Sequence, residues 1–180
     1  KDFSTRRSSQ QLDPDLTLTY FLKIDRPYKM PDMWPFHGPE LRIRFVNVVD
    51  LMRLQPKEEH PHGSSAADFD AFFTTDKPVI FAFHGYPALI HQLAYRHTNH
   101  ANIHVRGFKE KGTTTTPFDM LMMNDLDRYR LAMDVIRRVP GLEERHASLV
   151  QHFADERARM RAYAYENGED SPEVTGWDWL

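Results

Sequence analysis

The chain contains no cysteine among its 180 residues. This absence excludes disulfides, thiolate nucleophiles and cysteine-bound zinc or iron–sulfur sites, and it is typical of a reducing compartment, so we expect a cytoplasmic protein. No apolar run approaches 18 residues, and the N-terminal stretch KDFSTRRSSQQ lacks the apolar segment of a secretory signal. We therefore expect no membrane partner.

A strong excess of charge of either sign is also missing. The chain has 23 Lys and Arg against 26 Asp and Glu, for a net charge of −3. Nucleic-acid-binding domains carry strongly basic surfaces, so the composition argues against a nucleic-acid partner. Hydrophobic residues make up 41% of the chain, enough for a substantial core. The first residue is Lys rather than Met, as we expect of a domain taken from a longer enzyme.

Proline is concentrated at the start of the chain. Residues 1–40 hold five of the twelve prolines, and four of these recur at four-residue spacing from Pro27 to Pro39. Such spacing excludes a continuous helix. Within this segment only residues 16–24, LTLTYFLKI, have the pattern of a strand. We therefore divide the chain into a proline-rich segment, residues 1–40, and a domain, residues 41–180.

From residue 41 onward, strand patterns alternate with helical ones. Apolar, β-branched runs predict buried strands at 43–49, 78–84 and 102–107. A short turn at 50–54 and a polar loop at 55–65 follow the first of these strands. Helical patterns occupy four stretches: 65–73, 87–94, 117–139 and 142–167. Strands separated by helices in this order predict an α/β fold with a mostly parallel sheet.

Several helix starts carry recognisable capping residues. Ser65 and Thr116 are suited to N-cap positions, each with an Asp three residues later, and Pro87 and Pro117 are suited to first helical positions. We expect the helix at 87–94 to bury an apolar face made of Leu89, Ile90, Leu93 and Ala94. The last helix carries Leu149, Val150, Phe153, Met160 and Ala164 on one face, which Arg157 interrupts.

Histidines cluster in the middle of the chain, with seven of the ten between His60 and His104. Neither the His60-x-His62 pair nor the triple His97, His100 and His104 has the spacing of a zincin helix motif. A matched carboxylate is also lacking. We therefore assign no metal site and interpret these histidines as hydrogen-bonding or interface residues.

His84-Gly85-Tyr86-Pro87 lies where a predicted strand gives way to a helix. Open α/β sheets place ligand-contacting loops at this edge. Two interpretations stay open: His84 contacts a ligand, or the glycine simply permits the turn while His84 caps a carbonyl. The segment lacks the serine of a nucleophile elbow and the glycines of a dinucleotide loop.

A basic loop precedes the helix predicted to begin at Pro117. Cationic side chains, threonine hydroxyls and unpaired helix N–H groups are a combination that suits an anion. The loop either binds phosphate or faces an acidic partner surface, or it is a solvated loop with a threonine cap. As a hypothesis, the anion- or effector-binding residues are His84, Arg106, Lys109, Thr115 and Thr116.

Asp119, Asp125 and Asp127 suggest acid–base chemistry or binding of a cation. Their spacing, however, does not place them together on one face of the predicted helix. We interpret Asp125 with Arg128, and Asp127 with Arg130 or the region beyond it, as surface charge pairs. No catalytic residue is assigned.

Two further groups of residues suggest packing. Met120, Met122, Met123 and Met133 are expected to act as deformable packing residues. Trp177 and Trp179 form an aromatic anchor that either folds back on the domain or contacts a partner.

Four segments are familiar as a set: RIRFVNVVDLM from Arg42, EHPHG from Glu59, FTTDKPVIFAFHGYP from Phe73, and HTNHANIHVRGFKEKGTTTTPFDM from His97. Over residues 41–179 the chain resembles the C-terminal domain of phosphoketolases. These are thiamine-diphosphate enzymes that cleave xylulose 5-phosphate or fructose 6-phosphate with inorganic phosphate, giving acetyl phosphate, an aldose phosphate and water.

The resemblance implies a three-layer, mostly parallel but mixed five-stranded sheet with helices on both faces, similar to the transketolase C-terminal domain. It also implies a homodimer, with thiamine diphosphate and Mg held by preceding domains of the parent enzyme. This chain has no G-D-G followed by Asn-Asn to hold them, so we expect no cofactor here and an inactive isolated chain. Its role would be structural support and assembly alongside the remaining domains.

Residues 1–40 depart from the family pattern. The resemblance implies a strand, a turn similar to A-G-D-x-P-T and a helix in this region, and the proline-rich stretch lacks them. An alternative function is therefore kept: a free-standing anion- or effector-binding α/β module without catalysis. Binding of a nucleotide or acyl-CoA to the isolated chain would favour that alternative.

Overall fold

The computed structural model describes residues 3–4, 16–21 and 43–177. The chain divides into two compact units, the first made of residues 1–23 and 38–107 and the second of residues 24–37 and 108–180. The boundary expected near residue 40 falls outside the described ranges and stays a prediction. Across the described ranges, no helix combines the length and apolar character that a membrane span requires.

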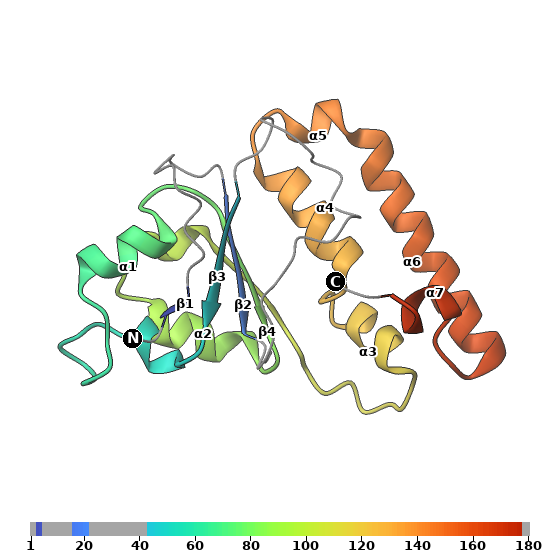
Figure 1. Ribbon diagram of the computed structural model, residues 1–180, viewed down its shortest axis with the longest axis horizontal. Helices are drawn as coiled ribbons and strands as arrows, with labels where there is room; N and C mark the ends of the chain where they lie inside the picture. Colours follow the sequence, from blue (N-terminus) through green and yellow to red (C-terminus); the bar gives the residue numbers. More distant parts are fainter. Residues whose placement is uncertain (1–2, 5–15, 22–42, 178–180) are drawn as a thin grey trace. The chain divides into compact units, whose positions relative to one another are not determined.

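The first unit is built on a five-stranded sheet with the order β1-β3-β2-β4-β5 (Figure 1). Its strands are β1 Phe3–Ser4, β2 Leu16–Phe21, β3 Ile43–Val48, β4 Val79–Phe83 and β5 Ile103–Gly107. β1 pairs antiparallel with β3, and the other pairs are parallel. The predicted mixed, mostly parallel sheet is thus confirmed. The strand expected over 16–24 is confirmed to Phe21, and residues 22–24 lie outside the described ranges.

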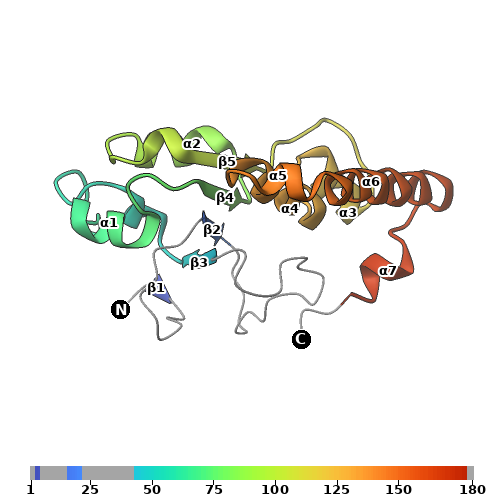
Figure 2. The same ribbon diagram turned by 90° about the horizontal axis from the view of Figure 1, so that it is seen from above.

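Four helical segments belong to this unit: η1 Leu51–Leu54, α1 Ala66–Phe73, α2 Pro87–Ala94 and η2 His100–Asn102. Figure 2 shows α1 and α2 against the same face of the sheet. The predicted helix starts are confirmed. The Ser65 hydroxyl accepts a hydrogen bond from the Asp68 N–H at 3.1 Å, and Pro87 is the first residue of α2.

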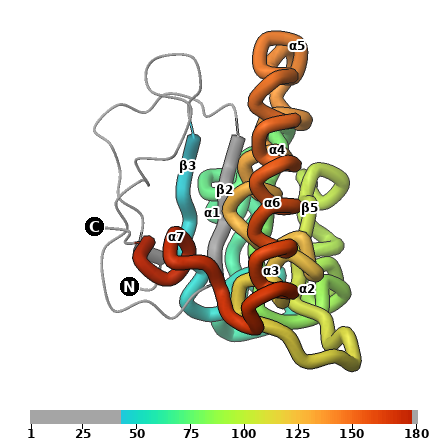
Figure 3. The backbone as a smooth tube through the Cα atoms, turned by 90° about the vertical axis from the view of Figure 1, so that its right-hand side faces the viewer, coloured from blue at the N-terminus to red at the C-terminus, as the bar shows by residue number. Residues whose placement is uncertain are grey.

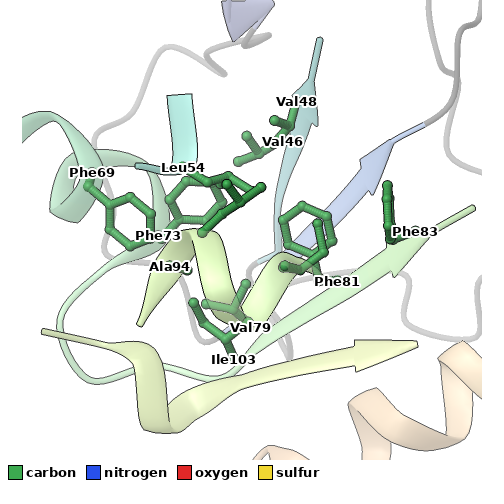
Figure 4. Packing of buried hydrophobic residues seen from close by; sticks show 12 residues of the cluster. Val46, Val48, Leu54, Phe69, Phe73, Val79, Phe81, Phe83, Ala94 and Ile103 are labelled. Atoms are coloured by element: carbon green, nitrogen blue, oxygen red, sulfur yellow. The ribbon is translucent and has the colours of Figure 1, made fainter. Parts of the chain in front are cut away.

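The core of the first unit lies between β4 and these helices (Figure 4). Val79, Phe81 and Phe83 alternate along one face of β4 and belong to the same buried cluster as Phe69 and Phe73 of α1. All five residues of β4 are buried, so its opposite face is covered as well. This double burial explains why its sequence is apolar throughout rather than alternating.

Two residues predicted to be buried in this unit are exposed. Val49 is 60% exposed because it follows the last residue of β3, where the strand has ended. Leu89 is 39% exposed, whereas Ile90, Leu93 and Ala94 are buried and form the apolar face of α2. The first prediction extended the strand by one residue, and the second included one residue too many in the apolar face of α2.

The second unit contains five helices in its described part: α3 Pro117–Met123, α4 Arg128–Arg138, α5 Leu142–Arg145, α6 Ala147–Asn167 and α7 Pro172–Thr175. Figure 3 shows α6 running alongside α4. The single helix predicted over 117–139 is wrong. Asp125 adopts φ 55°, outside the helical region, and Asp127 starts a new helix by accepting a hydrogen bond from the Arg130 N–H at 3.0 Å.

The single helix predicted over 142–167 is also wrong. His146, with φ −126°, ends α5 and precedes α6. Of the expected apolar face of α6, Phe153, Met160 and Ala164 are buried and the first two positions are half-buried. The packing role of methionine is confirmed for Met122 and Met133, which are both buried.

Candidate functional site

The turn after β4 is shaped by close backbone contact with the end of β5. Phe83 and Gly107 are register partners at the carboxyl ends of these two strands. A Cβ on Gly107 would lie 2.4 Å from the Gly85 carbonyl oxygen and 2.5 Å from Cδ of Pro87. Gly107 therefore leaves room for the Gly85–Pro87 backbone, and the turn is fixed by the strand beside it.

His84 and Arg106 both lie at this edge, as the sequence predicts. His84 is exposed, directly after β4, and Arg106 is the penultimate residue of β5. Ile103 and Val105 pack with the core cluster, so alternation places Arg106 on the opposite face of the sheet, beside Ala82 in register. Both His84 and Arg106 already have partners within the chain. Ligand contact by either residue stays a prediction.

The basic loop and its threonines belong to the second unit. The Thr116 hydroxyl accepts a hydrogen bond from the Asp119 N–H at 3.4 Å, which confirms the predicted cap. Thr115 Oγ1 donates to Asp119 Oδ2 at 2.8 Å, and the Phe118 N–H donates to Asp170 Oδ2 at 2.9 Å. The chain's own carboxylates thus already occupy the hydroxyl and N–H groups that an anion would use here.

Lys109 and Lys111 are exposed on the same loop. The Lys109 N–H donates to Asn124 Oδ1 at 2.8 Å, and Asn124 Nδ2 donates to the Met120 carbonyl at 3.0 Å. These bonds fix the backbone of the loop and leave the Lys109 side chain at the surface. Binding of an anion by this loop remains untested.

Buried ion pairs in the second unit are a feature that the sequence reasoning missed. Asp127 has a fully buried side chain, and its Oδ2 accepts a hydrogen bond from Arg157 Nε at 3.0 Å. Burial raises the pKa of Asp127, which the nearby Arg157 guanidinium partly opposes. Arg157 Nη2 also donates to the Met122 carbonyl at 2.7 Å and to Asp125 Oδ1 at 2.8 Å.

A second ion pair also joins an arginine of α6 to a buried aspartate, one helical turn after Arg157. Arg161 Nε donates to Oδ1 of the buried Asp119 at 2.9 Å. The interpretation of Asp127 as a member of a surface pair is wrong, because its side chain is fully buried. Its partner is Arg157 of α6, in the region beyond Arg130. Asp125 also pairs with Arg157, at 2.8 Å, and lies 3.8 Å from Arg130. The spacing of Arg157 and Arg161, four residues apart on α6, indicates that both face the same neighbour but does not identify their partners.

The histidines of the first unit are mostly hydrogen-bonded, as the sequence predicts. His97 Nε2 lies 2.9 Å from the Leu54 carbonyl, and its ring stacks on Phe69 at 3.5 Å between centroids. Burial lowers the pKa of His97, and the Leu54 carbonyl opposes that shift. His97 is therefore a neutral donor in the core.

Two other histidine pairs lie near the surface. His62 Nδ1 lies 2.9 Å from Asp50 Oδ2, and His60 Nδ1 accepts from the His62 N–H at 3.1 Å. His91 Nδ1 and His100 Nε2 are 3.4 Å apart. Burial, and then the neighbouring His100, lower the pKa of His91. Within residues 43–177 and the two short N-terminal strands, no group of three or more ligating side chains is arranged to hold a metal.

One of the two interpretations of the C-terminal tryptophans is now confirmed. The Trp177 ring lies 4.6 Å from Cζ of Arg128 on α4, so Trp177 folds back on its own unit. Trp179 lies outside the described residues.

Comparison with known proteins accounts for most of the chain. A family profile described as the XFP C-terminal domain matches residues 32–179. A probable phosphoketolase of Nocardia farcinica is 64% identical over 141 residues, which is 78% of this chain and 17% of the relative. A probable phosphoketolase of Streptomyces avermitilis is 62% identical over 143 residues, and a probable phosphoketolase 2 of Nostoc sp. is 59% identical over 143. Each of these two alignments covers 79% of this chain and 18% of the relative. The chain, which spans less than a fifth of the length of these relatives, therefore belongs to the phosphoketolase C-terminal domain family.

Proposed function

We propose that this chain is the C-terminal assembly domain of a larger phosphoketolase. The parent enzyme would cleave xylulose 5-phosphate, fructose 6-phosphate or both with inorganic phosphate, giving acetyl phosphate and an aldose phosphate. The supporting observation is the family match over residues 32–179, together with relatives named phosphoketolase at 59–64% identity. Because the alignments cover only 17% and 18% of those relatives, the catalytic machinery would reside in the remaining domains.

The described residues of this chain do not fit thiamine diphosphate and its metal. A magnesium–diphosphate site needs carboxylate and amide oxygens that are available to the ion. The buried carboxylates of the second unit are instead paired with arginines: Asp119 with Arg161, Asp127 with Arg157 and Asp134 with Arg130. Cofactor and Mg would therefore be bound by other domains, and we assign no catalytic step to a residue of this chain.

The proposed partners follow from this role. The remaining domains of the parent enzyme would pack against this chain, and a homodimer in the cytoplasm is the expected assembly. Two-fold homodimers are the commonest symmetric oligomers of soluble proteins. Ketose phosphate and phosphate would be bound by the assembled enzyme.

The test begins with the source gene. The reading frame upstream of Lys1 should encode a thiamine-diphosphate motif, and the encoded full-length enzyme should produce acetyl phosphate from xylulose 5-phosphate, measured as its hydroxamate. Deleting the region that corresponds to this chain should reduce both activity and the dimer mass measured by light scattering. Acetyl phosphate formation by the isolated chain, or a start codon close to Lys1, would overturn the proposal.

Within this role, we propose that two separate groups contact an anion: His84 with Arg106 in the first unit, and Lys109 in the second. The support is their chemistry and their place at or just beyond the ends of β4 and β5. Thr115 and Thr116 would join Lys109 only by giving up their hydrogen bonds to Asp119. Replacing both Arg106 and Lys109 by Ala in the full-length enzyme should weaken phosphate and sugar-phosphate binding, whereas Lys57→Ala should not. Unchanged affinities would exclude both contacts.

A further inference from the structure

The chain turns back after α6 and continues as a short segment, residues 168–177, which we name the C-terminal strap (Figure 3). It begins at Gly168, the C-cap of α6, whose φ of 72° lets the chain leave the helix axis. The strap contains α7, a single turn of four residues, none of which is buried. Ser171, which precedes α7, is buried. The strap thus contributes little to the apolar core of its unit.

Polar contacts attach the first half of the strap to α3 and α6. Asp170 Oδ2 accepts a hydrogen bond from the Phe118 N–H at 2.9 Å, and Ser171 Oγ lies 3.0 Å from the Met160 sulfur. Phe118 is the second residue of α3, so a carboxylate from the strap satisfies an N–H of that helix end.

Charged contacts attach the second half. Glu173 accepts two hydrogen bonds from Arg159, at 3.0 and 2.6 Å, in a bidentate arrangement. Both side chains are about half exposed or more, at 49% for Arg159 and 61% for Glu173. Exposed ion pairs of this kind are weak and are screened by salt.

Trp177 makes the last attachment, to Arg128 on α4. The Arg128 guanidinium lies over three rings, with Cζ at 5.0 Å from Phe118, 4.8 Å from Tyr129 and 4.6 Å from Trp177. Its Nη2 donates to the Tyr129 hydroxyl at 3.2 Å, and its buried Nε has no hydrogen-bond partner among the described residues. Phe118 is in α3 and Tyr129 is in α4, outside the strap. Arg128 therefore keeps its contacts with these two rings if Trp177 moves away.

We propose that the C-terminal strap is a releasable latch that opens as one piece about Gly168 while α3, α4 and α6 stay folded. Its attachments to the described residues include hydrogen bonds, an exposed ion pair and a cation–π contact, which are individually weak and can be lost together. The single turn α7 is too short to persist alone, so release also unfolds it. Opening uncovers the guanidinium of Arg128 and the first turn of α3, and rising ionic strength favours the open form.

Amide hydrogen exchange of the whole chain, measured by NMR, tests this latch directly. The Phe118 N–H is bound to the strap through Asp170, whereas the Arg130 N–H is bound to Asp127, a carboxylate outside the strap. If the strap opens as one piece, the Phe118 and α7 amides exchange at a common rate that increases with added salt. The Arg130 amide serves as the matched control and should keep its slower rate.

Substitutions of two glutamates that bind the same arginine, Arg159, make the test more specific. Arg159 also binds Glu156 on its own helix, at 2.6 Å. Glu173→Gln removes the charge and one of the two acceptors with which the strap binds Arg159, and should speed exchange of the Phe118 amide by about twofold to fivefold. Glu156→Gln makes the same change within α6 and should leave that amide unchanged. The latch is refuted if the Phe118 and α7 amides exchange at unrelated rates, if they exchange only with global unfolding, or if both variants behave alike.

Discussion

At the scale of single residues, long-range ion pairs determine much of the second unit. Asp127 and Arg157 are 30 positions apart, and Asp119 and Arg161 are 42 positions apart. Local spacing could show neither partnership, because it relates each Asp only to its neighbours on the same helix. The sequence marked Arg157 as an interruption of an apolar face, and the structure supplies the reason: this arginine holds the junction between α3 and α4.

Replacing Arg157 by Met should destabilise the chain by about 3–5 kcal/mol, because a buried carboxylate loses its counter-charge. The defect should shrink as pH falls from neutral toward the raised pKa of Asp127. Burial raises the pKa of Asp127, so the folded variant takes up a proton there before the unfolded chain does. Urea unfolding of the variant and the parent chain across this pH range measures both effects.

Arg159→Met is the matched control, since its partner Glu173 is mostly exposed. We expect it to change stability only slightly and without this pH dependence. A defect of similar size in both variants would contradict the importance of burial at Asp127.

His97 should make the first unit sensitive to mild acid. Burial lowers the pKa of His97 below its ordinary value of 6.5, so the unfolded chain binds the proton first as pH falls. Stability is therefore fully present above about pH 6.5 and is lost as pH falls toward the folded-state pKa. His97→Leu should cost about 1–3 kcal/mol at neutral pH, because the Leu54 carbonyl loses its donor, and should weaken the acid sensitivity.

Chemical denaturation of this variant at several pH values provides the measurement. His62→Leu is the control, because His62 is exposed and bonds an accessible carboxylate. An acid sensitivity identical in the parent and His97→Leu chains would assign the effect to other groups.

At the scale of elements, strands were easier to predict than helix ends. The apolar runs of β3, β4 and β5 and the caps at Ser65 and Thr116 act locally, and local patterns reveal them. The junctions at Asp125 and His146 were missed because helical periodicity continues across them. Asp127 caps α4 locally, but the apolar periodicity on either side of it predicts an unbroken helix.

Gly107→Ala should be among the most damaging single-methyl changes in the first unit. The added carbon would lie 2.4 Å from the Gly85 carbonyl, so the backbones of two adjoining strand ends must separate. We expect a loss of about 3 kcal/mol, at the upper end of the range for overpacking.

Gly112→Ala is the matched change, since no atom lies within 4 Å of the added carbon and only the φ of 65° is unfavourable. Its expected cost is about 1 kcal/mol. Thermal unfolding of the two variants compares them, and equal losses would argue against the contact at the strand ends.

At the scale of the whole molecule, the sequence was enough to predict the fold and the family, but not to locate a ligand-binding site. The mixed five-stranded order and the family match agree with the resemblance carried by segments such as the one from Arg42. The proposed anion residues are divided between the two units, with Arg106 in the first and Lys109 in the second. Sequence proximity therefore made these two residues look like one site although they belong to different units.

If the chain serves assembly, substitutions in its buried parts should alter the thermal stability of the parent enzyme rather than its substrate binding. Arg157→Met in the full-length enzyme should shorten the half-life of activity on heating, because the buried Asp127 loses its partner. It should leave the KM for the ketose phosphate within about twofold, since Arg157 is not among the proposed anion-binding residues. Steady-state kinetics before and after heating would check this. A large rise in KM with an unchanged half-life on heating would indicate that this chain contacts the substrate directly.

The double burial of β4 has a consequence for the chain before it has folded. The strand β4 has the sequence VIFAF, which is uncharged and favours β structure. In the folded protein both faces of this strand are buried. On a nascent or heat-damaged chain it would be available to pair with other copies, the hazard that leads to aggregates. Lys77 and Pro78 directly before it, and Gly85 and Pro87 shortly after it, keep this stretch short. The segment that gives the first unit its core is thus also the one that most needs protection during synthesis.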